Sequence, residues 1–164
     1  MVLAPTTSTT FALPSGSPER AARLLHNAAA ALAAGRFERA VQICSIGLNR
    51  PIPADPQLSL GLIRAEARVQ LGAWAEAARD CERVLVAAPN ARAFALLAKA
   101  AFEQQHHIAA QQAIESALAE EPDSIGHLRL YVEILLASKQ HDAAVATAKQ
   151  VHARSGDEAS IRLV

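Results

Sequence analysis

Apolar residues recur at intervals of three and four along most of this chain, which is the spacing of one face of an α-helix. The clearest example lies between residues 64 and 90, where apolar positions run up to Gly72 and resume after it. They are Ala65, Val69 and Leu71, then Ala77, Cys81, Val84 and Leu85. This pattern predicts two amphipathic helices joined by a tight turn at Gly72 and ended by Pro89, because glycine adopts a left-handed conformation at low cost and proline cannot continue a helix.

The same pattern recurs along the chain. Aligning it with itself places Ala77 in register with Ala40, Ala110 and Ala144, at successive separations of 37, 33 and 34 residues. A period near 34 residues with two helices in each period is typical of a helical solenoid. We therefore predict an all-α chain of four helix-turn-helix repeats, at about residues 21–54, 57–90, 91–124 and 125–156.

These residues resemble the tetratricopeptide repeat (TPR) family, whose repeats carry a small residue in each helix, glycine at the turn, an aromatic residue after it and a closing proline. The matching residues are Gly35 and Gly72, Phe37 and Trp74, Ala28, Ala65 and Ala98, Ala40, Ala77, Ala110 and Ala144, and Pro89 and Pro122. The departures are Gln105 and Lys139 at the turn glycine, His107 and His141 at the aromatic position, and Val132 at the small position. The resemblance covers about residues 20–154 and implies a right-handed TPR solenoid over residues 18–154.

Residues that favour helix starts lie ahead of each predicted pair. Ser17 is expected to cap the first helix, with Pro18 in its first turn. Asp55, Asn90 and Asp123 are expected to cap the first helices of the second, third and fourth pairs.

Both ends of the chain differ from the repeats. Residues 1–17 carry no charge and are rich in Thr, Ser and Pro, so we expect a disordered N-terminal arm. The alternative is that Phe11 and Leu13 of this arm fold back into the groove of the domain and occupy it in place of a ligand. Residues 157–164 form either a short C-terminal tail or a partial capping helix in which Ile161 and Leu163 dock on the fourth pair, unless the chain is a fragment of something longer.

Composition narrows the class of protein and its partners. The 164 residues are 51% hydrophobic and only 4% aromatic, which suits one domain of closely packed, alanine-rich helices. Sixteen basic and sixteen acidic residues give a formal net charge of +0, which favours neither nucleic acid nor an anionic membrane as partner. No secretory or mitochondrial targeting pattern precedes Arg20, and two scattered cysteines suit a reducing compartment, so we expect a cytoplasmic protein.

The residues that could carry chemistry fit structural roles better. Cys44 and Cys81 occupy equivalent positions in successive repeats, which predicts two buried thiols without a disulfide, because equivalent helices lie about 8–10 Å apart or more. A cysteine nucleophile with His26 as base is the less favoured reading. His106, His107 and His141 are expected in solvated turns, without a bound metal.

The acidic residues lie at helical spacing and are not expected to bring two carboxylates together. Glu66, Glu76, Asp80 and Glu82 are expected on solvated faces, where no carboxylate pair could act as general acid and base. No glycine-rich, phosphate-binding loop occurs. We therefore predict that the chain is not an enzyme and binds no cofactor.

The resemblance implies where a partner would bind, because the first helix of each TPR pair lines a concave groove. The groove should be apolar at its start and mixed in charge at its end. The implied positions are Ala22, Leu25, Ala29, Leu32, Ser59, Leu62, Ile63, Glu66, Val69, Arg92, Leu96, Lys99, Phe102, Glu103, Arg129 and Glu133.

The middle repeats resemble the TPR co-chaperones that grip an acidic chaperone tail through a clamp of Lys, Asn and Arg residues. The matching positions here are Leu25, Ala29, Ile63, Arg92 and Leu96, of which only Arg92 has a suitable charge. This difference predicts that the clamp is absent.

The leading hypothesis is a non-enzymatic interaction module or adaptor that binds a peptide or amphipathic helix of a protein partner in the groove. One alternative is a regulatory or targeting domain of a larger protein. Another is a dedicated chaperone for an apolar client, like the TPR chaperones of type III secretion. Alanine-rich surfaces also allow a homodimer.

Overall fold

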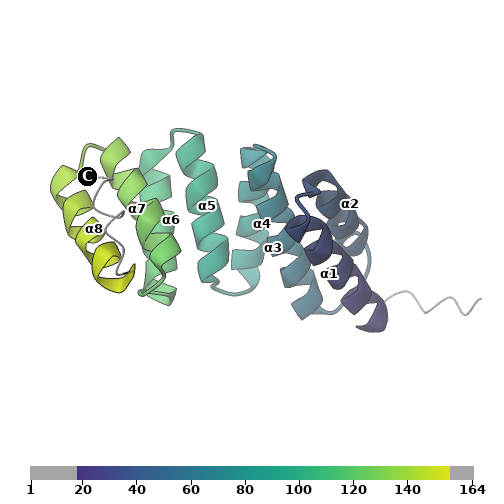
Figure 1. Cartoon of the computed structure of the whole chain (residues 1–164). Coiled ribbons are helices and arrows are strands. Elements are labelled where there is room, and N and C mark those ends of the chain that lie inside the picture. Colours follow the sequence, from purple (N-terminus) through teal and green to yellow (C-terminus); the bar gives the residue numbers. More distant parts are fainter. Residues whose placement is uncertain (1–17, 156–164) are drawn as a thin grey trace, which may run out of the picture.

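The computed structural model describes residues 18–155, which form eight α-helices and no strand (Figure 1). The helices stack in chain order as four pairs in an elongated array, so the prediction of an all-α solenoid of helical repeats is confirmed. Their bounds are α1 Pro18–Ala33, α2 Phe37–Leu48, α3 Ala54–Gln70, α4 Trp74–Ala87, α5 Ala91–Glu103, α6 His107–Glu120, α7 Ile125–Ala137 and α8 His141–Ser155.

The turn inside each pair has the same backbone geometry. Gly35 and Gly72 adopt φ values of 69° and 72°, and Gln105 and Lys139 adopt 63° and 61°. In every pair the residue after this position donates its backbone N–H to the carbonyl five residues earlier, as Ala73 does to Arg68 at 2.9 Å. This is the hydrogen bond that closes a helix with a left-handed residue. The third and fourth turns therefore keep the geometry of the glycine turns without the glycine.

Replacing Gln105 and Lys139 with glycine is expected to stabilise the protein by about 0.5–1 kcal/mol at each site. A left-handed L-residue costs about 1–2 kcal/mol, and the greater entropy of glycine in the unfolded chain offsets part of the gain from removing it. The melting temperature of each variant should rise by about 1–4 °C. Gly72→Ala is the control and should lower it. An unchanged or lower melting temperature for both glycine variants would contradict this account.

Small residues form the contacts between the helices of each pair. Ala28, Ala65 and Ala98 in the first helices are fully buried, as are Ala40, Ala77, Ala110 and Ala144 in the second helices. A methyl group lets two helix backbones approach closely. The core therefore consists of small clusters between neighbouring helices, one after another along the array.

Of the four predicted helix caps, one is confirmed and two are wrong. The side chain of Asn90 accepts a hydrogen bond from the backbone N–H of Ala93 at 3.0 Å. Pro53 is the capping residue of α3, which begins at Ala54, so Asp55 lies in the first turn. Ser124 precedes α7 without a side-chain cap, while Asp123 pairs with Arg154 of α8 at 2.9 Å.

The fourth cap, Ser17, lies outside the described residues. So do the predicted arm at residues 1–17, with Phe11 and Leu13, and the predicted tail at residues 157–164.

Candidate functional site: the concave surface

The first helices of the pairs lie on the inner side of the array. Helix α1 contacts α3, α3 contacts α5, and α5 contacts α7. Within residues 18–155 no comparable contact joins α2 to α4, α4 to α6 or α6 to α8. Because the helices are closer together on the side of α1, α3, α5 and α7, the array bends towards that side. The first helices therefore line the concave surface.

A hollow of about 520 Å³ lies on this surface between α1, α3 and α5. Five of the residues expected in the groove line it, together with three that were not expected there. The five are Ala29, Leu32, Ile63, Glu66 and Arg92, and the three are Ala33, Phe37 and Gln70. Ala33 and Gln70 each lie four residues after a lining residue, so an extension of the helical spacing would have found both.

Several of the other expected positions pack between helices. Leu25 packs on the buried cluster around Cys44 and Leu60. Leu62 and Leu96 pack on a second cluster, between α3, α4 and α5, and Val69 is only 9% exposed. These side chains hold neighbouring helices together and do not line the hollow.

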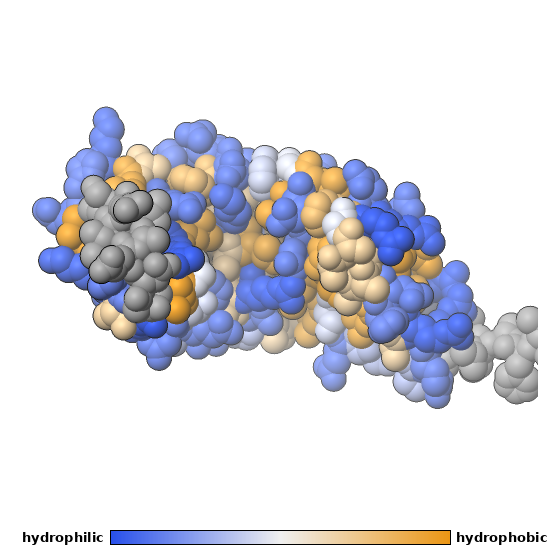
Figure 2. All heavy atoms as spheres, in the orientation of Figure 1, coloured by the Kyte–Doolittle hydropathy of each residue, from blue (hydrophilic) through white to orange (hydrophobic). Residues whose placement is uncertain are grey.

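The charged half of the surface contains one ion pair between helices and one within a helix. Arg92 of α5 forms an ion pair with Glu66 of α3. Lys99 pairs with Glu103 one turn later at 2.8 Å, and its ammonium lies 5.6 Å from the centre of the Phe102 ring. In the next pair Arg129 and Glu133 are exposed on α7. In the orientation of Figure 1, apolar side chains are exposed over α1 and hydrophilic ones follow towards the middle of the array (Figure 2).

Comparison with solved structures places this architecture among known folds. The chain matches a structure of MamA, residues 41 to the end, from Desulfovibrio magneticus RS-1, with a TM-score of 0.74 and 19% identity over 84% of this chain and 77% of that one. It matches the NMR structure of the first TPR domain of human RPAP3 with a TM-score of 0.68 and 22% identity, over 77% of this chain and 98% of that one. No family model and no curated protein matches the sequence.

The chain has a TPR-type helical-repeat fold. The resemblance drawn from the turn glycines, small residues and closing prolines is therefore confirmed for the fold. At these identities the likeness establishes the arrangement of the helices, and the chemistry of the surfaces has to be read from the side chains of this chain.

One acidic residue of the TPR array is not solvated as expected. Asp80 of α4 is only 2% exposed. Arg64 of α3 donates to it twice, through Nε at 2.9 Å and Nη2 at 2.6 Å, and Arg68 donates through Nη1 at 2.5 Å. Arg64 also reaches the hydroxyl of Ser45 in α2 at 3.3 Å. The predicted solvated position of Asp80 is therefore wrong, because two arginines of the facing helix satisfy the buried carboxylate.

The sequence contained a signal for this buried group. Asp80 lies three residues after the small residue Ala77, a position that holds Ile43, Ala113 and Thr147 in the first, third and fourth repeats. A charge at a position that is uncharged in the other three repeats, with two arginines spaced by one helical turn in the preceding helix, indicates a buried ion pair.

Both cysteines are fully buried and free, as expected. Burial raises the pKa of the Cys44 thiol to about 11 and that of Cys81 to about 12. Both thiols are therefore protonated at neutral pH, whereas a nucleophile needs the thiolate. His26, considered as a base, is exposed on α1.

The histidines of the turns divide into two environments. His106 and His141 are exposed, as expected. His107 is half-buried, with its ring edge-on to Phe102 at 5.9 Å between centroids, so the solvated reading is wrong there. Among the described residues no three His, Cys, Asp or Glu side chains cluster as metal ligands would. None of the described helices combines the length and the apolar character needed to cross a membrane.

Proposed function

We propose that residues 18–154 form a non-enzymatic interaction module that binds a peptide or an amphipathic helix of a protein partner on the concave surface. The observation that carries this proposal is the hollow between α1, α3 and α5. Leu32, Phe37 and Ile63 give it an apolar lining, and the paired charges of Glu66 and Arg92 line it as well.

Such a surface suits a ligand with one apolar face. Apolar anchors of the partner would enter the hollow, where burial of carbon surface supplies most of the binding energy. The Glu66–Arg92 and Lys99–Glu103 pairs would contact polar groups of the same ligand and set its direction. A helix that places anchors at spacings of three and four residues, or an extended segment, has this chemistry.

An acidic chaperone tail is a poor candidate for this ligand. Of the clamp positions only Arg92 is basic, and its guanidinium is paired with Glu66. A terminal carboxylate would have to compete with that pair and would meet the apolar residues Ala29 and Ile63 elsewhere in the hollow. The favoured partner is therefore apolar and not strongly acidic.

Placing a charge in the hollow tests the proposal. Ala29 is exposed in the middle of α1 and lines the hollow. Ala29→Glu should weaken binding of the partner at least 10-fold, because a carboxylate would have to be desolvated against apolar anchors. Full-length parent and variant chains would be used to capture partners from native lysate, and the affinity for the captured protein would then be measured by titration.

Ala146→Glu provides the matched control, because Ala146 is also exposed in the middle of a helix, α8, away from the hollow. Both variants should show the circular dichroism of the parent. The proposal requires a partner that the parent and Ala146→Glu bind equally and that Ala29→Glu loses. A partner bound equally by all three chains would place the binding site elsewhere on the molecule.

A further inference from the structure

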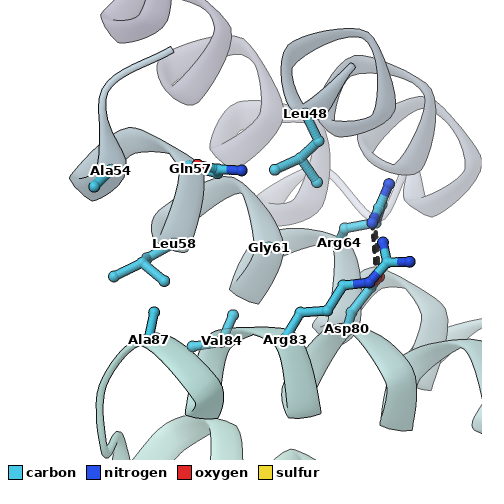
Figure 3. Close-up of a pocket in the computed structure, with 10 residues that line it drawn as sticks. All are labelled: Leu48, Ala54, Gln57, Leu58, Gly61, Arg64, Asp80, Arg83, Val84 and Ala87. Atoms are coloured by element: carbon cyan, nitrogen blue, oxygen red, sulfur yellow. Dashed lines mark hydrogen bonds and ion pairs between the residues drawn. The ribbon is translucent and has the colours of Figure 1, made fainter. Parts of the chain in front are cut away.

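A second cavity lies apart from the concave hollow and shares no lining residue with it. This cavity, here called the interhelix pocket, has a volume of about 250 Å³ and lies between the end of α2, the first half of α3 and the second half of α4. Figure 3 shows Leu58 and Ala87 at one end, the charged side chains of Arg64, Asp80 and Arg83 at the other, and Leu48 between them. Leu48, Leu58 and Val84 line the apolar part, and Arg64, Asp80 and Arg83 line the polar part.

Helix α3 carries no side chain where Gly61 lines the pocket. Gly61 lies four residues before the small residue Ala65. The equivalent residue of the first, third and fourth repeats is Leu24, Phe94 and Leu128. Glycine inside a helix costs about 1 kcal/mol relative to alanine, and an unfilled space forfeits packing contacts as well. The second repeat thus lacks the side chain that the other three repeats supply.

The polar end of the pocket carries an excess of positive charge. Asp80 is held by both Arg64 and Arg68, which leaves this group with one net positive charge. Arg83 is exposed at the wall of the pocket and makes no hydrogen bond or ion pair within the described part of the chain. Although the chain has a formal net charge of +0, the polar end of the pocket is locally positive, so it favours an anionic group beside the apolar part.

We propose that the interhelix pocket binds a protein segment that presents a leucine or phenylalanine side chain with an aspartate or glutamate next to it. The other repeats show which side chains occupy this position, since Leu24, Phe94 and Leu128 are of this kind. The volume equals that of roughly eight water molecules at about 30 Å³ each, which leaves room for one such side chain. The neighbouring carboxylate pairs with Arg83, whose fork of donors matches it.

The probe is the heptapeptide acetyl-Gly-Ser-Asp-Phe-Asp-Ser-Gly-amide, titrated into the full-length, ¹⁵N-labelled chain. Saturable amide shifts are expected at the end of α2, the first half of α3 and the second half of α4. Replacing both aspartates of the probe with asparagine should weaken binding about 5-fold, and replacing its phenylalanine with alanine should weaken it at least 10-fold. Arg83→Gln should reproduce the first loss, because it removes the partner of the carboxylate.

Filling the pocket provides the decisive variant. Gly61→Leu next to Val84 recreates the pair of Leu128 and Val151 in the fourth repeat. A Cβ at position 61 would lie 3.0 Å from Val84 Cγ2, so Val84 has to move by a few tenths of an ångström. We expect this variant to melt at or above the temperature of the parent and to bind the probe at least 10-fold more weakly.

If Gly61→Leu fails to fold, Gly61→Phe with Val84→Ala recreates Phe94 and Ala117 of the third repeat and serves the same purpose. Ala146→Glu should bind the probe like the parent. Equal binding by the parent and a folded, filled variant would overturn the proposal. So would an absence of saturable shifts, or shifts confined to the concave residues of α1, α3 and α5, and the last result would assign the probe to the concave hollow.

Discussion

Asp80→Ala is expected to lower the free energy of unfolding by about 3–5 kcal/mol, a large share of the stability of a domain of this size. The substitution removes three charge-assisted hydrogen bonds and leaves Arg64, which is 8% exposed, without its counter-ion. Arg64 also contacts Ser45, so the loss affects the junction of α2, α3 and α4. Urea unfolding followed by circular dichroism at 222 nm would measure the change.

The third repeat supplies the control for this experiment. Its residues at the positions of Arg64 and Asp80 are Leu97 and Ala113. The double variant Arg64→Leu, Asp80→Ala should therefore recover most of the loss, because no buried charge remains unpaired and apolar packing replaces the ion pair. If the double variant is as unstable as Asp80→Ala alone, lost packing around residue 80 is the cause, and the account based on an uncompensated charge is wrong.

Leu60→Ala is the second substitution with a large expected effect, a loss of about 2–5 kcal/mol. Leu60 is among the largest fully buried side chains of the described residues and packs with Ala28, Cys44 and Ile63. It also occupies the space beside Gly47, where an added Cβ would lie 2.5 Å from Leu60 Cδ1. Ala28, Cys44 and Gly47 beside it are too small to fill the vacated volume, so we expect a cavity to remain.

Thermal unfolding would measure this loss as a melting temperature lower by about 4–20 °C. Val86→Ala is the control, because Val86 is 89% exposed and its truncation should change the free energy of unfolding by less than about 0.5 kcal/mol. A loss below about 1 kcal/mol for Leu60→Ala would mean that α2 and α3 close over the vacated space.

The concave hollow and the interhelix pocket suggest two separate binding sites on this array. The concave hollow arises from the way in which successive first helices pack, and every repeat contributes to that side. The interhelix pocket lies between the end of α2 and the second repeat, with Gly61 at a position where the other repeats carry a large side chain. If both bind partner segments, the chain can hold two proteins at once, and Ala29→Glu and Gly61→Leu would separate the two activities.

Features that depend on local spacing could be predicted from the sequence. The helical period, the turns at Gly35 and Gly72 and the cap at Asn90 are decided by residues within one or two helical turns of each other. The recurrence of small residues every 33 to 37 positions predicted that the pairs stack, because alanines at equivalent positions bury the same face of each pair. The all-α solenoid and the buried cysteines followed from these patterns alone.

The tertiary structure decided which polar and apolar side chains meet. Asp80 is buried because α3 brings Arg64 and Arg68 against α4, a contact over 12 to 16 residues that no local pattern specifies. Leu62 and Leu96 pack between helices, although their spacing along the sequence also suits the groove. The reason is that one face of a first helix is partly covered by the neighbouring helices and partly exposed to solvent. Gln105 and Lys139 take left-handed turns because the packed helices on either side fix the chain path there, which offsets the local cost.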